Sequence, residues 1–391
     1  MRVLTLNVWA LAEPLARDNG ARMEHIGAAL QRLELDIAAF QELWTRSARE
    51  QLIAAGHRAG LVHAWQPEAT WRGSGLTVLS RSPIRNPRFH AFRQAGVAER
   101  IHEADYLGRK GFVECVIDTP DGPVGLVNTH LQADYTRRDR SPYVPYRTAQ
   151  VVQIAAALRA TPYPVLLAGD LNFTESSPEY AIFTGLTGLA DVAASLDRRR
   201  PTWLPTNPYT AGKPGPAVRI DYLFQRHGRQ RSLRPVSIER VLDQPFPLDG
   251  QTAAPSDHAG LVGEFESVPG GAPPARIHCA PLADARILLE AGLEAVQARQ
   301  RTQRVSGFLG LAALPLGLAV SRLSRRRFLK RAALGAGILA GSLGAGRLAL
   351  SAAFRPEERA GFADALRSLE ALANESAAGH RCPTAPSDSP P

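Results

Sequence analysis

Short apolar runs that each deliver a polar side chain are the feature that most constrains the fold of this chain. The runs at 3–8, 37–40, 124–129 and 164–168 have the length and composition of buried strands, and segments with helical apolar spacing lie between them. They deliver Asn7, Glu42, His130 and Asp170 at or just beyond their ends. Alternating strands and helices favour an α/β fold, so we expect these side chains to meet at a sheet edge.

Two later runs add an aspartate and a histidine. The strand-like run at 218–224 contains Asp221, and Ser256-Asp257-His258 opens the apolar run at 259–265. An acid inside an apolar strand is costly unless it is paired. Asp221 therefore either forms a salt bridge with a neighbour such as Arg219 or holds a histidine ring in one tautomer. His258 suits a general base because the ordinary pKa of histidine lies near neutrality.

Oxygen ligands in this set favour magnesium. Glu42, assisted by the amide oxygen of Asn7 and joined by Asp257, offers the hard ligands that Mg²⁺ prefers, and the Cys or His cluster that zinc would want is missing. Metal-assisted phosphodiester hydrolysis needs a cation on a phosphate oxygen, an activated water and donors for the developing negative charge. The sequence can supply each of them.

The remaining candidates take the proton-transfer and phosphate-binding roles in this hypothesis. We assign His258 as general base and Asp221 as the residue that orients it. His130 and Asn172 are assigned as donors to phosphoryl oxygens, and Asp170 positions the attacking water or the facing histidine. Each residue alone has a structural alternative, such as a helix cap, a turn or a solvated strand end. The set as a whole, always at strand ends, is what indicates a catalytic site.

Six motifs spread over roughly residues 1–266 resemble those of the endonuclease/exonuclease/phosphatase superfamily with the DNase I-like fold. They are Thr5-Leu6-Asn7-Val8-Trp9, Gln41-Glu42-Leu43-Trp44, Asn128-Thr129-His130-Leu131, Gly169-Asp170-Leu171-Asn172, Arg219-Ile220-Asp221-Tyr222 and Ser256-Asp257-His258. The resemblance implies a four-layer α/β sandwich, with two mixed sheets face to face and helices outside. It also implies Mg²⁺-dependent cleavage of phosphodiesters or phosphomonoesters.

Further stretches resemble the membrane-anchored neutral sphingomyelinases within that superfamily. They are Arg22-Met23, Gly73-Ser74-Gly75-Leu76, the segment 130–135 and Tyr146-Arg147-Thr148-Ala149-Gln150. This likeness implies hydrolysis of sphingomyelin, or a related phosphosphingolipid, to ceramide and phosphocholine. A phospholipase C acting on inositol-phosphate or other phospholipids, a nuclease, and a binding module with a dead site are the alternatives. Lys110 resembles a lysine near the lipid phosphate in this subfamily; its alternative is a solvated lysine.

The C-terminal third has the composition of a membrane-attached tail. The chain turns to Pro and Gly near 267–274, the run at 305–320 has no charge but contains Pro315, and the run at 332–354 is apolar apart from Arg347. We predict a catalytic domain at 1–266, a linker and helix at 267–300, membrane-associated apolar segments with a basic loop at 301–354, and a helix with a disordered tail at 355–391.

The net charge of +9 is concentrated in this tail. Residues 1–270 carry 30 basic against 28 acidic side chains, whereas residues 271–391 carry 16 against 9. A nearly neutral catalytic part counts against nucleic acid as a partner, and a basic tail beside apolar runs favours a bilayer, with anionic lipid as a candidate partner. No protein partner can be inferred.

Signals for localisation point in different directions. The first residues are strand-like rather than a secretory signal, and three widely spaced cysteines suggest a reducing compartment without a disulfide framework. We therefore predict a membrane protein with its catalytic domain on the cytosolic face. The segment 322–331 carries six positive charges, so two full spans would instead place the catalytic domain outside. A first run that only enters the interface would resolve this, while 324–330 also resembles a twin-arginine export signal.

Overall fold

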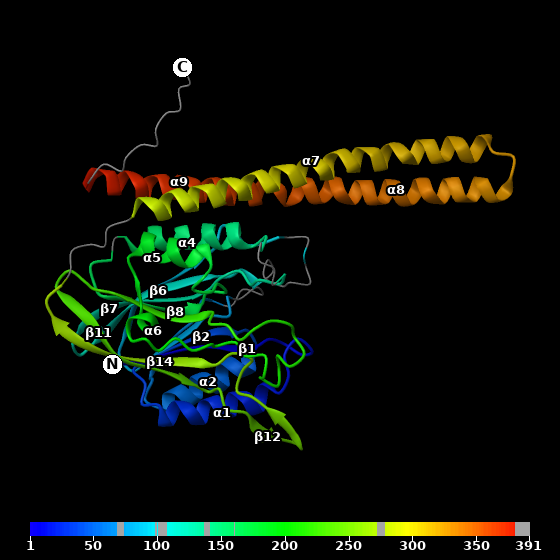
Figure 1. The fold of residues 1–391 in the computed structure, drawn as a ribbon. Helices are drawn as coiled ribbons and strands as arrows, with labels where there is room; N and C mark the ends of the chain where they lie inside the picture. The colour runs from blue at the N-terminus through cyan, green and yellow to red at the C-terminus, as the bar shows by residue number, and fades with distance from the viewer. Residues whose placement is uncertain are drawn as a thin grey trace.

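Two mixed six-stranded sheets pack face to face at the centre of the molecule (Figure 1). The computed structural model describes residues 1–68, 74–97, 100, 108–136, 141–159, 161–271 and 278–379. The first sheet has the order β11 (Arg231–Val241), β14 (Gly260–Pro269), β1 (Arg2–Ala10), β2 (Ile37–Leu43), β4 (Thr77–Ser80) and β3 (His63–Trp65). The second has the order β5 (Ile84–Ala91), β6 (Gly111–Thr119), β7 (Gly122–His130), β8 (Val165–Asp170), β10 (Asp221–Arg226) and β9 (Ala190–Asp191).

Helices cover the outer face of each sheet. The first sheet is covered by α1 (Asn19–Arg32) and α2 (Arg46–Arg58), and the second by α4 (Val144–Leu158) and α5 (Pro178–Thr187) (Figure 1). A short α6 (Val192–Ser195) follows β9, and β12 (Phe246–Leu248) pairs with β13 (Gln251–Ala253) beside the sandwich. The predicted four-layer α/β sandwich is confirmed. Branched and aromatic side chains fill the space between the sheets, as their strand propensity leads us to expect.

Strand pairing brings the predicted polar residues to one end of the sandwich. In the parallel pair of β1 and β2, Asn7 lies opposite Gln41, and in the parallel pair of β7 and β8, His130 lies opposite Asp170. Asp170 is also paired with Asp221 across the antiparallel β8 and β10. Since the carboxyl ends of parallel strands lie at one edge of a sheet, these registers bring the candidate residues of each sheet to the same edge of that sheet.

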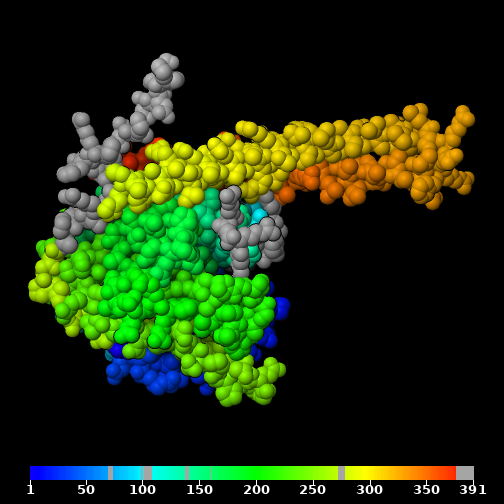
Figure 2. All heavy atoms as spheres, in the orientation of Figure 1, coloured from blue at the N-terminus to red at the C-terminus, as the bar shows by residue number. Residues whose placement is uncertain are grey.

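The C-terminal helices add a fifth layer and an extended hairpin. Helix α7 (Cys279–Leu323) crosses the outer face of α4 and α5, and α8 (Arg327–Ala353) returns antiparallel beside it. Helix α9 (Arg355–Gly379) then packs back onto the sandwich. Side chains of α7 and α9, including Leu289 and Phe362, belong to the same apolar core as α4 and α5. Figure 2 shows the hairpin of α7 and α8 standing clear of the sandwich.

Three details of the tail differ from the sequence expectations. Helix α7 is continuous across residue 300, because the stretch 297–304 consists of good helix formers, and it continues through Pro315. Helix α9 occupies most of the segment predicted as a helix with a disordered tail and runs to Gly379, because the Ala-rich stretch favours helix; residues 380–391 lie outside the described residues. Cys279 is disulfide-bonded, although the wide spacing of the cysteines predicted no disulfide framework.

Helices α7 and α8 meet through small residues. A Cβ atom added at Gly310 would lie 2.5 Å from the carbonyl oxygen of Ala340, and one added at Gly344 would lie 2.6 Å from that of Gly307. Such close backbone approach is typical of helix pairs in membranes. Two helices in the described residues are long and apolar enough to cross a membrane, judged by length and composition. They form the C-terminal apolar segment that the sequence predicted as a membrane anchor.

Candidate active site

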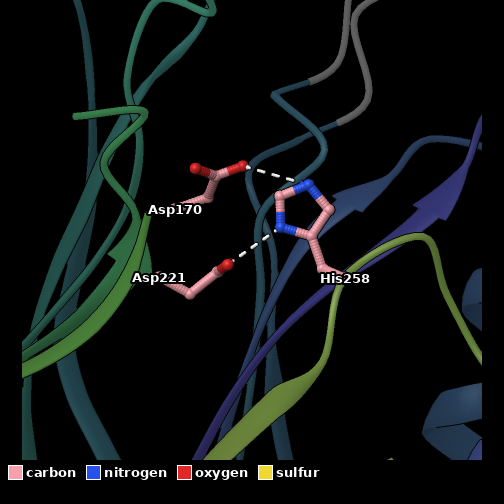
Figure 3. A group of neighbouring side chains, drawn as sticks. All are labelled: Asp170, Asp221 and His258. Carbon is pink, nitrogen blue, oxygen red and sulfur yellow. Dashed lines mark hydrogen bonds and ion pairs between the residues drawn. The ribbon is translucent and has the colours of Figure 1, made fainter. Parts of the chain in front are cut away.

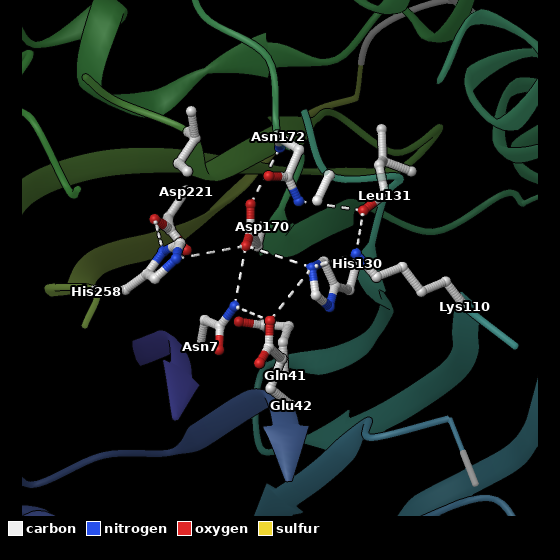
Figure 4. A network of polar contacts seen from close by, with 12 residues as sticks. Asn7, Gln41, Glu42, Lys110, His130, Leu131, Asp170, Asn172, Asp221 and His258 are labelled. Atoms are coloured by element: carbon white, nitrogen blue, oxygen red, sulfur yellow. Dashed lines mark hydrogen bonds and ion pairs between the residues drawn. The ribbon is translucent and has the colours of Figure 1, made fainter. Parts of the chain in front are cut away.

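Polar side chains from both sheets converge at the carboxyl ends of β1, β2, β7 and β8 (Figure 4). All the predicted site residues lie in or beside this cluster. The first sheet and the loop before β14 contribute Asn7, Glu42, Asp257 and His258, and the second sheet with its flanking loops contributes Lys110, His130, Asp170, Asn172 and Asp221. The site therefore lies across the interface between the two sheets.

His258 is held by Asp221 and faces Asp170 (Figure 3). Its Nδ1 lies 2.9 Å from Asp221 Oδ2, and its Nε2 lies 3.9 Å from Asp170 Oδ2. Burial alone would lower the pKa of His258, but Asp221, Asp170 and Asp257 raise it well above its ordinary value. This geometry matches that of a histidine kept in one orientation by a carboxylate, with the other ring nitrogen facing the site.

Asp221 pairs with His258 rather than with the neighbouring Arg219. Arg219 instead forms ion pairs with Asp191, and with Glu175 at 2.6 Å. Asp221 is fully buried, and its backbone N–H donates to Thr202 Oγ1 over 3.2 Å. Of the two explanations for an acid inside an apolar strand, the structure therefore contains the Asp–His pair.

Glu42 sits in a strained backbone conformation at the end of β2. Its φ of 56° lies in the left-handed region, which is unusual for a residue with a side chain. Asn7 Nδ2 donates to Glu42 Oε1 over 3.1 Å and to Asp170 Oδ2 over 3.0 Å, while Asn7 Oδ1 accepts from the N–H of Trp9. Asn7 thus ties a carboxylate of one sheet to a carboxylate of the other.

Uncompensated negative charge beside Glu42 makes a divalent cation a good fit. Burial, then Asp257, raises the pKa of Glu42, and Lys110 opposes this rise. Asp257 is 7% exposed, and its Oδ1 has no hydrogen-bond partner among the described residues. Two neighbouring carboxylates, one with an unsatisfied buried oxygen, form a hard-oxygen donor set of the kind that Mg²⁺ prefers.

His130 contacts Lys110 through its ring. Lys110 Nζ donates to His130 Nε2 over 2.9 Å and to the carbonyl oxygen of Leu131 over 2.8 Å. Burial, then the positive charge of Lys110, lowers the pKa of His130 well below its ordinary value, so the ring is neutral. Lys110 is 5% exposed and is therefore not a solvated lysine.

Asp170 lies at the centre of the network. Burial, then the charge of Asp221, raises its pKa to about 7. Its Oδ1 accepts from the backbone N–H of Asn172 over 3.0 Å, and its Oδ2 lies 3.5 Å from His130 Nε2. Asn172 Nδ2 donates to the carbonyl oxygen of Leu131 over 3.1 Å. Asp170, Asp221 and His258 each offer one ligand atom within 4.8 Å of the others, so they form a second group that could hold a metal.

Sequence reasoning missed several residues that position these side chains. Arg22 is fully buried and donates to the carbonyl oxygens of Val8, Trp9 and Pro255, which ties the end of β1 to the loop before His258. Ser256 Oγ donates to the carbonyl oxygen of Asn7 over 2.6 Å. A basic residue among apolar positions of α1 was the available signal for Arg22, but its partners are distant in sequence.

Comparison with known proteins places this arrangement in context. A family model described as Endonuclease/Exonuclease/phosphatase family matches residues 4–258. A Drosophila melanogaster protein that its name assigns provisionally to the neutral sphingomyelinases is 30% identical over 68% of this chain and 60% of its own length. Human sphingomyelin phosphodiesterase 2 is 29% identical over 58% of this chain and 56% of its own length. The chain thus spans less than two thirds of these relatives.

Solved structures share the fold at lower sequence identity. The structure of SmcL has a TM-score of 0.54 at 21% identity, covering 68% of this chain and 98% of its own. A Staphylococcus aureus beta toxin with bound magnesium ions has a TM-score of 0.52 at 19% identity, covering 67% and 98%. D. rerio TDP2 complexed with single-strand DNA product has a TM-score of 0.53 at 20% identity, covering 68% and 98%.

Proposed function

Because this chain belongs to the endonuclease/exonuclease/phosphatase family, we propose that it is a Mg²⁺-dependent phosphodiesterase that hydrolyses sphingomyelin to ceramide and phosphocholine. The observation that carries the proposal is His258, held by Asp221 at 2.9 Å beside a cluster of carboxylates. The substrate class follows from the similarity to relatives named as sphingomyelin phosphodiesterases, together with the apolar C-terminal hairpin.

His258 is the general base in this proposal. A water oxygen attacks phosphorus and its proton passes to His258 Nε2. The bond from phosphorus to the ceramide oxygen breaks, that oxygen takes up a proton from solvent, and His258 later returns its own proton to solvent. Asp221 keeps Nδ1 protonated and the ring in place. Asp170 lies on the Nε2 side of the ring and positions the water. Phosphorus gains one oxygen bond and loses one, so the step balances.

His130, Asn172 and Lys110 act on the phosphate in this proposal. The Nε2 atom of His130 accepts from Lys110, so the positive charge that supports the phosphate comes from the lysine rather than from the ring. Asn172 stands at the carboxyl end of β8 with its amide near Leu131. These residues are assigned to binding and orienting the phosphoryl oxygens as negative charge develops.

Glu42 and Asp257 would hold Mg²⁺, with Asn7 orienting the Glu42 carboxylate through its Nδ2. When bound, the ion would supply positive charge to a phosphate oxygen and would oppose the carboxylate charge that keeps the proton on His258. Asp221 and His258 already contact each other, so we assign their group to proton transfer rather than to a metal.

Two alternatives share this chemistry. A Saccharomyces cerevisiae relative named as an inositol phosphosphingolipids phospholipase C is 25% identical over 40% of this chain, which favours an inositol lipid as the second candidate substrate. A nuclease is the third candidate, on the fold it shares with TDP2. The nearly neutral charge of residues 1–270 counts against nucleic acid.

The test is hydrolysis of three substrates by the purified full chain. We expect release of phosphocholine from sphingomyelin in detergent micelles, little product from inositol lipids or plasmid DNA, and no activity with excess chelator. His258→Ala should lower turnover by about 10²–10⁴-fold, the range for a lost general base. The matched control His57→Ala removes an exposed histidine of α2 and should leave turnover unchanged. Full activity in chelator, or in His258→Ala, would refute the assignment.

The side of the membrane on which the catalytic domain lies stays a prediction, and the hairpin sharpens it. Both ends of the hairpin return to the catalytic domain, so a fully crossing hairpin would place the basic segment 322–331 on the opposite side. The positive-inside rule would then favour an exported catalytic domain. The predicted cytosolic face therefore requires a hairpin that enters the bilayer without crossing it. Protease added outside sealed cells should spare the catalytic domain; its digestion would contradict the prediction.

A further inference from the structure

The first half of α7 packs against α4 and α9 and forms a rigid joint between the hairpin and the catalytic domain, which we call the mount. The first half of α7 is part of the protein core, with Leu289 and Val296 fully buried. A Cβ atom added at Gly292 would lie 2.5 Å from the ring of Phe362 in α9 and 2.7 Å from Pro145 in α4. Such close packing leaves α7 no room to pivot on α4 and α9.

A buried polar network fixes the same joint. Tyr146 OH, in the first turn of α4, donates to Glu358 of α9, and Arg299 of α7 reaches both, at 3.1 Å and 3.3 Å. Arg355 also pairs with Glu358, and Tyr146, Glu358 and Arg355 are all buried. Charge-assisted hydrogen bonds of this kind are directional, so the network sets the position of α7 relative to the catalytic domain.

Chain direction determines where the hairpin points. β7 ends at His130 in the active site, and Gln132, two residues further on, is hydrogen-bonded to Arg147 and Gln150 of α4, so the first turns of α4 lie at the active-site end. Arg299 contacts the first of these turns, and α7 then continues past it. The N-terminus, where β1 begins, lies at the opposite end of the molecule from the hairpin tip (Figure 1). The hairpin therefore extends from the catalytic domain in the same direction as β1 runs, toward the end of the sandwich that holds the active site.

The projecting part has the surface of a membrane-embedded element. Its outward side chains are mostly apolar, with Phe308, Leu309, Leu316, Ile338 and Leu339 all more than half exposed, and its exposed charges are Arg347 and the basic residues near the tip at 322–331. Helices that are apolar all round are found in cores or in membranes, and only 6% of the most apolar window of α7 is buried. As a helix the uncharged run at 305–320 is about 24 Å long, shorter than the roughly 30 Å hydrocarbon core of a bilayer, which suits a hairpin that enters the bilayer without crossing it.

A cleft lined by arginines lies where the apolar run begins. Its volume is about 250 Å³, and its lining residues are Gln297, Gln300, Arg301, Arg304 and Arg359. The cleft directly precedes Val305, the first residue of the uncharged run. Guanidinium groups at this position match the phosphate and carboxylate groups of anionic lipid headgroups.

We propose that the hairpin, the mount and the arginine cleft dock the catalytic domain on a bilayer in one fixed orientation. Anionic headgroups occupy the cleft, the apolar run enters the hydrocarbon, and the active site opens toward the lipid surface. This proposal rests on the proposed function, because it assumes that the substrate is a membrane lipid. It adds that catalysis on a bilayer depends on the rigidity of the mount and not only on anchoring.

Flexible joints would test this dependence. We would insert Gly-Gly-Ser-Gly-Gly after Arg304 and again after Phe354, which frees the hairpin from the mount but keeps it attached. The matched control carries both inserts at the hairpin tip, after Ser324. Vesicles of sphingomyelin, phosphatidylcholine and phosphatidylserine would be compared with detergent micelles. We expect the joint variant to lose at least about tenfold in rate on vesicles, because misplacing substrate by ångströms has costs of that order. Its micelle rate and its vesicle-bound fraction should equal those of the control.

The outcomes separate the two proposals. An unchanged vesicle rate in the joint variant would overturn the fixed orientation while leaving the enzyme assignment intact. Failure of the wild-type chain to hydrolyse sphingomyelin in micelles would refute the proposed function instead. Replacing Arg301 and Arg304 by Gln should lower the vesicle rate only when phosphatidylserine is present; equal loss without it would overturn the role of the cleft.

Fluorescent labels would test the orientation directly. Leu15 follows β1 at the active-site end, whereas Tyr163 precedes β8 at the far end, and both are exposed. A fluorescent unnatural amino acid at position 15 should be quenched by headgroup spin-labelled lipid, and one at position 163 should not. Equal quenching at both positions would overturn the proposed orientation.

Discussion

At the residue scale, the candidate site holds more negative charge than its own cations balance. Glu42, Asp170, Asp221 and Asp257 surround Lys110 and His258, and burial raises the pKa of both Glu42 and Asp170. Protein interiors tolerate such an excess only when something supplies positive charge. The excess negative charge therefore favours the binding of a cation, and it destabilises the folded protein when no metal is bound.

The first residue-scale prediction concerns Asp221. Asp221→Asn keeps the shape of the side chain but removes the charge that stabilises the His258 imidazolium. We expect kcat on micellar sphingomyelin to fall by about 10²–10⁴-fold with little change in KM. Asp197→Asn, at a side chain that is 93% exposed, is the control and should behave as wild type. A wild-type kcat in Asp221→Asn would exclude the orienting role.

Glu42 carries the second residue-scale prediction. In chelator, Glu42→Gln should raise Tm by about 2–4 °C, because it removes a buried charge that is repelled by Asp257. Added Mg²⁺ should then stabilise the wild type but not the variant, which calorimetry would measure without any substrate. The control Glu50→Gln, on the exposed face of α2, should retain the Mg²⁺ effect. Equal Mg²⁺ stabilisation of Glu42→Gln and wild type would place the ion elsewhere.

At the element scale, glycines set how closely α7 and α8 approach. The backbones meet at Gly310 and Gly344, whereas a Cβ at Gly346 would contact nothing within 4 Å. Gly344, which contacts α7, and Gly346, which does not, lie in the same apolar run, and the local composition does not distinguish them. Only the pairing of the two helices decides which glycines are structurally required.

This contrast gives a matched pair of variants. Gly344→Leu should destabilise the hairpin by about 1–3 kcal/mol, the usual cost of overpacking, because its Cβ would lie 2.6 Å from the carbonyl oxygen of Gly307. Gly346→Leu adds the same volume toward open space and should be neutral. Unfolding of the two proteins in bicelles, followed by hydrogen exchange in α7 and α8, would measure the difference. Similar protection in both would contradict close helix contact.

Much of the core layout could be predicted from sequence at this scale. The strands β1, β2, β7, β8, β10 and β14 all fall on predicted runs, because each is an apolar run with a clear end. Contacts that depend on distant partners could not be predicted. Three such contacts join residues that no local pattern relates: Lys110 with His130, Arg22 with the end of β1 and the loop before His258, and Thr202 with Asp221. The same holds for α7 and α9, whose apolar faces fit soluble or membrane packing equally well.

At the scale of the whole molecule, the C-terminal helices serve two environments. The first half of α7 and the buried side chains of α9, such as Phe362 and Leu369, complete the core over α4 and α5, while the hairpin exposes apolar side chains. The predicted catalytic domain at 1–266 would therefore expose apolar surface of α4 and α5 if it were expressed alone.

Two shortened proteins would test this division. A chain ending at residue 271 should lose several kcal/mol of stability and bind hydrophobic dye, since burial of each large apolar side chain contributes about 1.5–3 kcal/mol. A chain in which residues 305–353 are replaced by a short Gly-Ser loop keeps the packed halves of α7 and α9. It should retain the wild-type Tm and the micelle activity. Equal stability of both proteins would show that α7 and α9 do not support the core.

The bond from Asn7 to both Glu42 and Asp170 joins the halves of the molecule at the reaction centre. Neither half contains a complete set of reacting groups. The first sheet and the loop before β14 carry Glu42 and His258, and the second sheet with its flanking loops carries Asp170, Asp221 and Lys110. A small shift of one sheet relative to the other would therefore abolish the proposed activity while leaving each half folded. On heating, turnover should therefore be lost at a lower temperature than secondary structure, so the rate of hydrolysis would report small changes in the relative position of the two sheets.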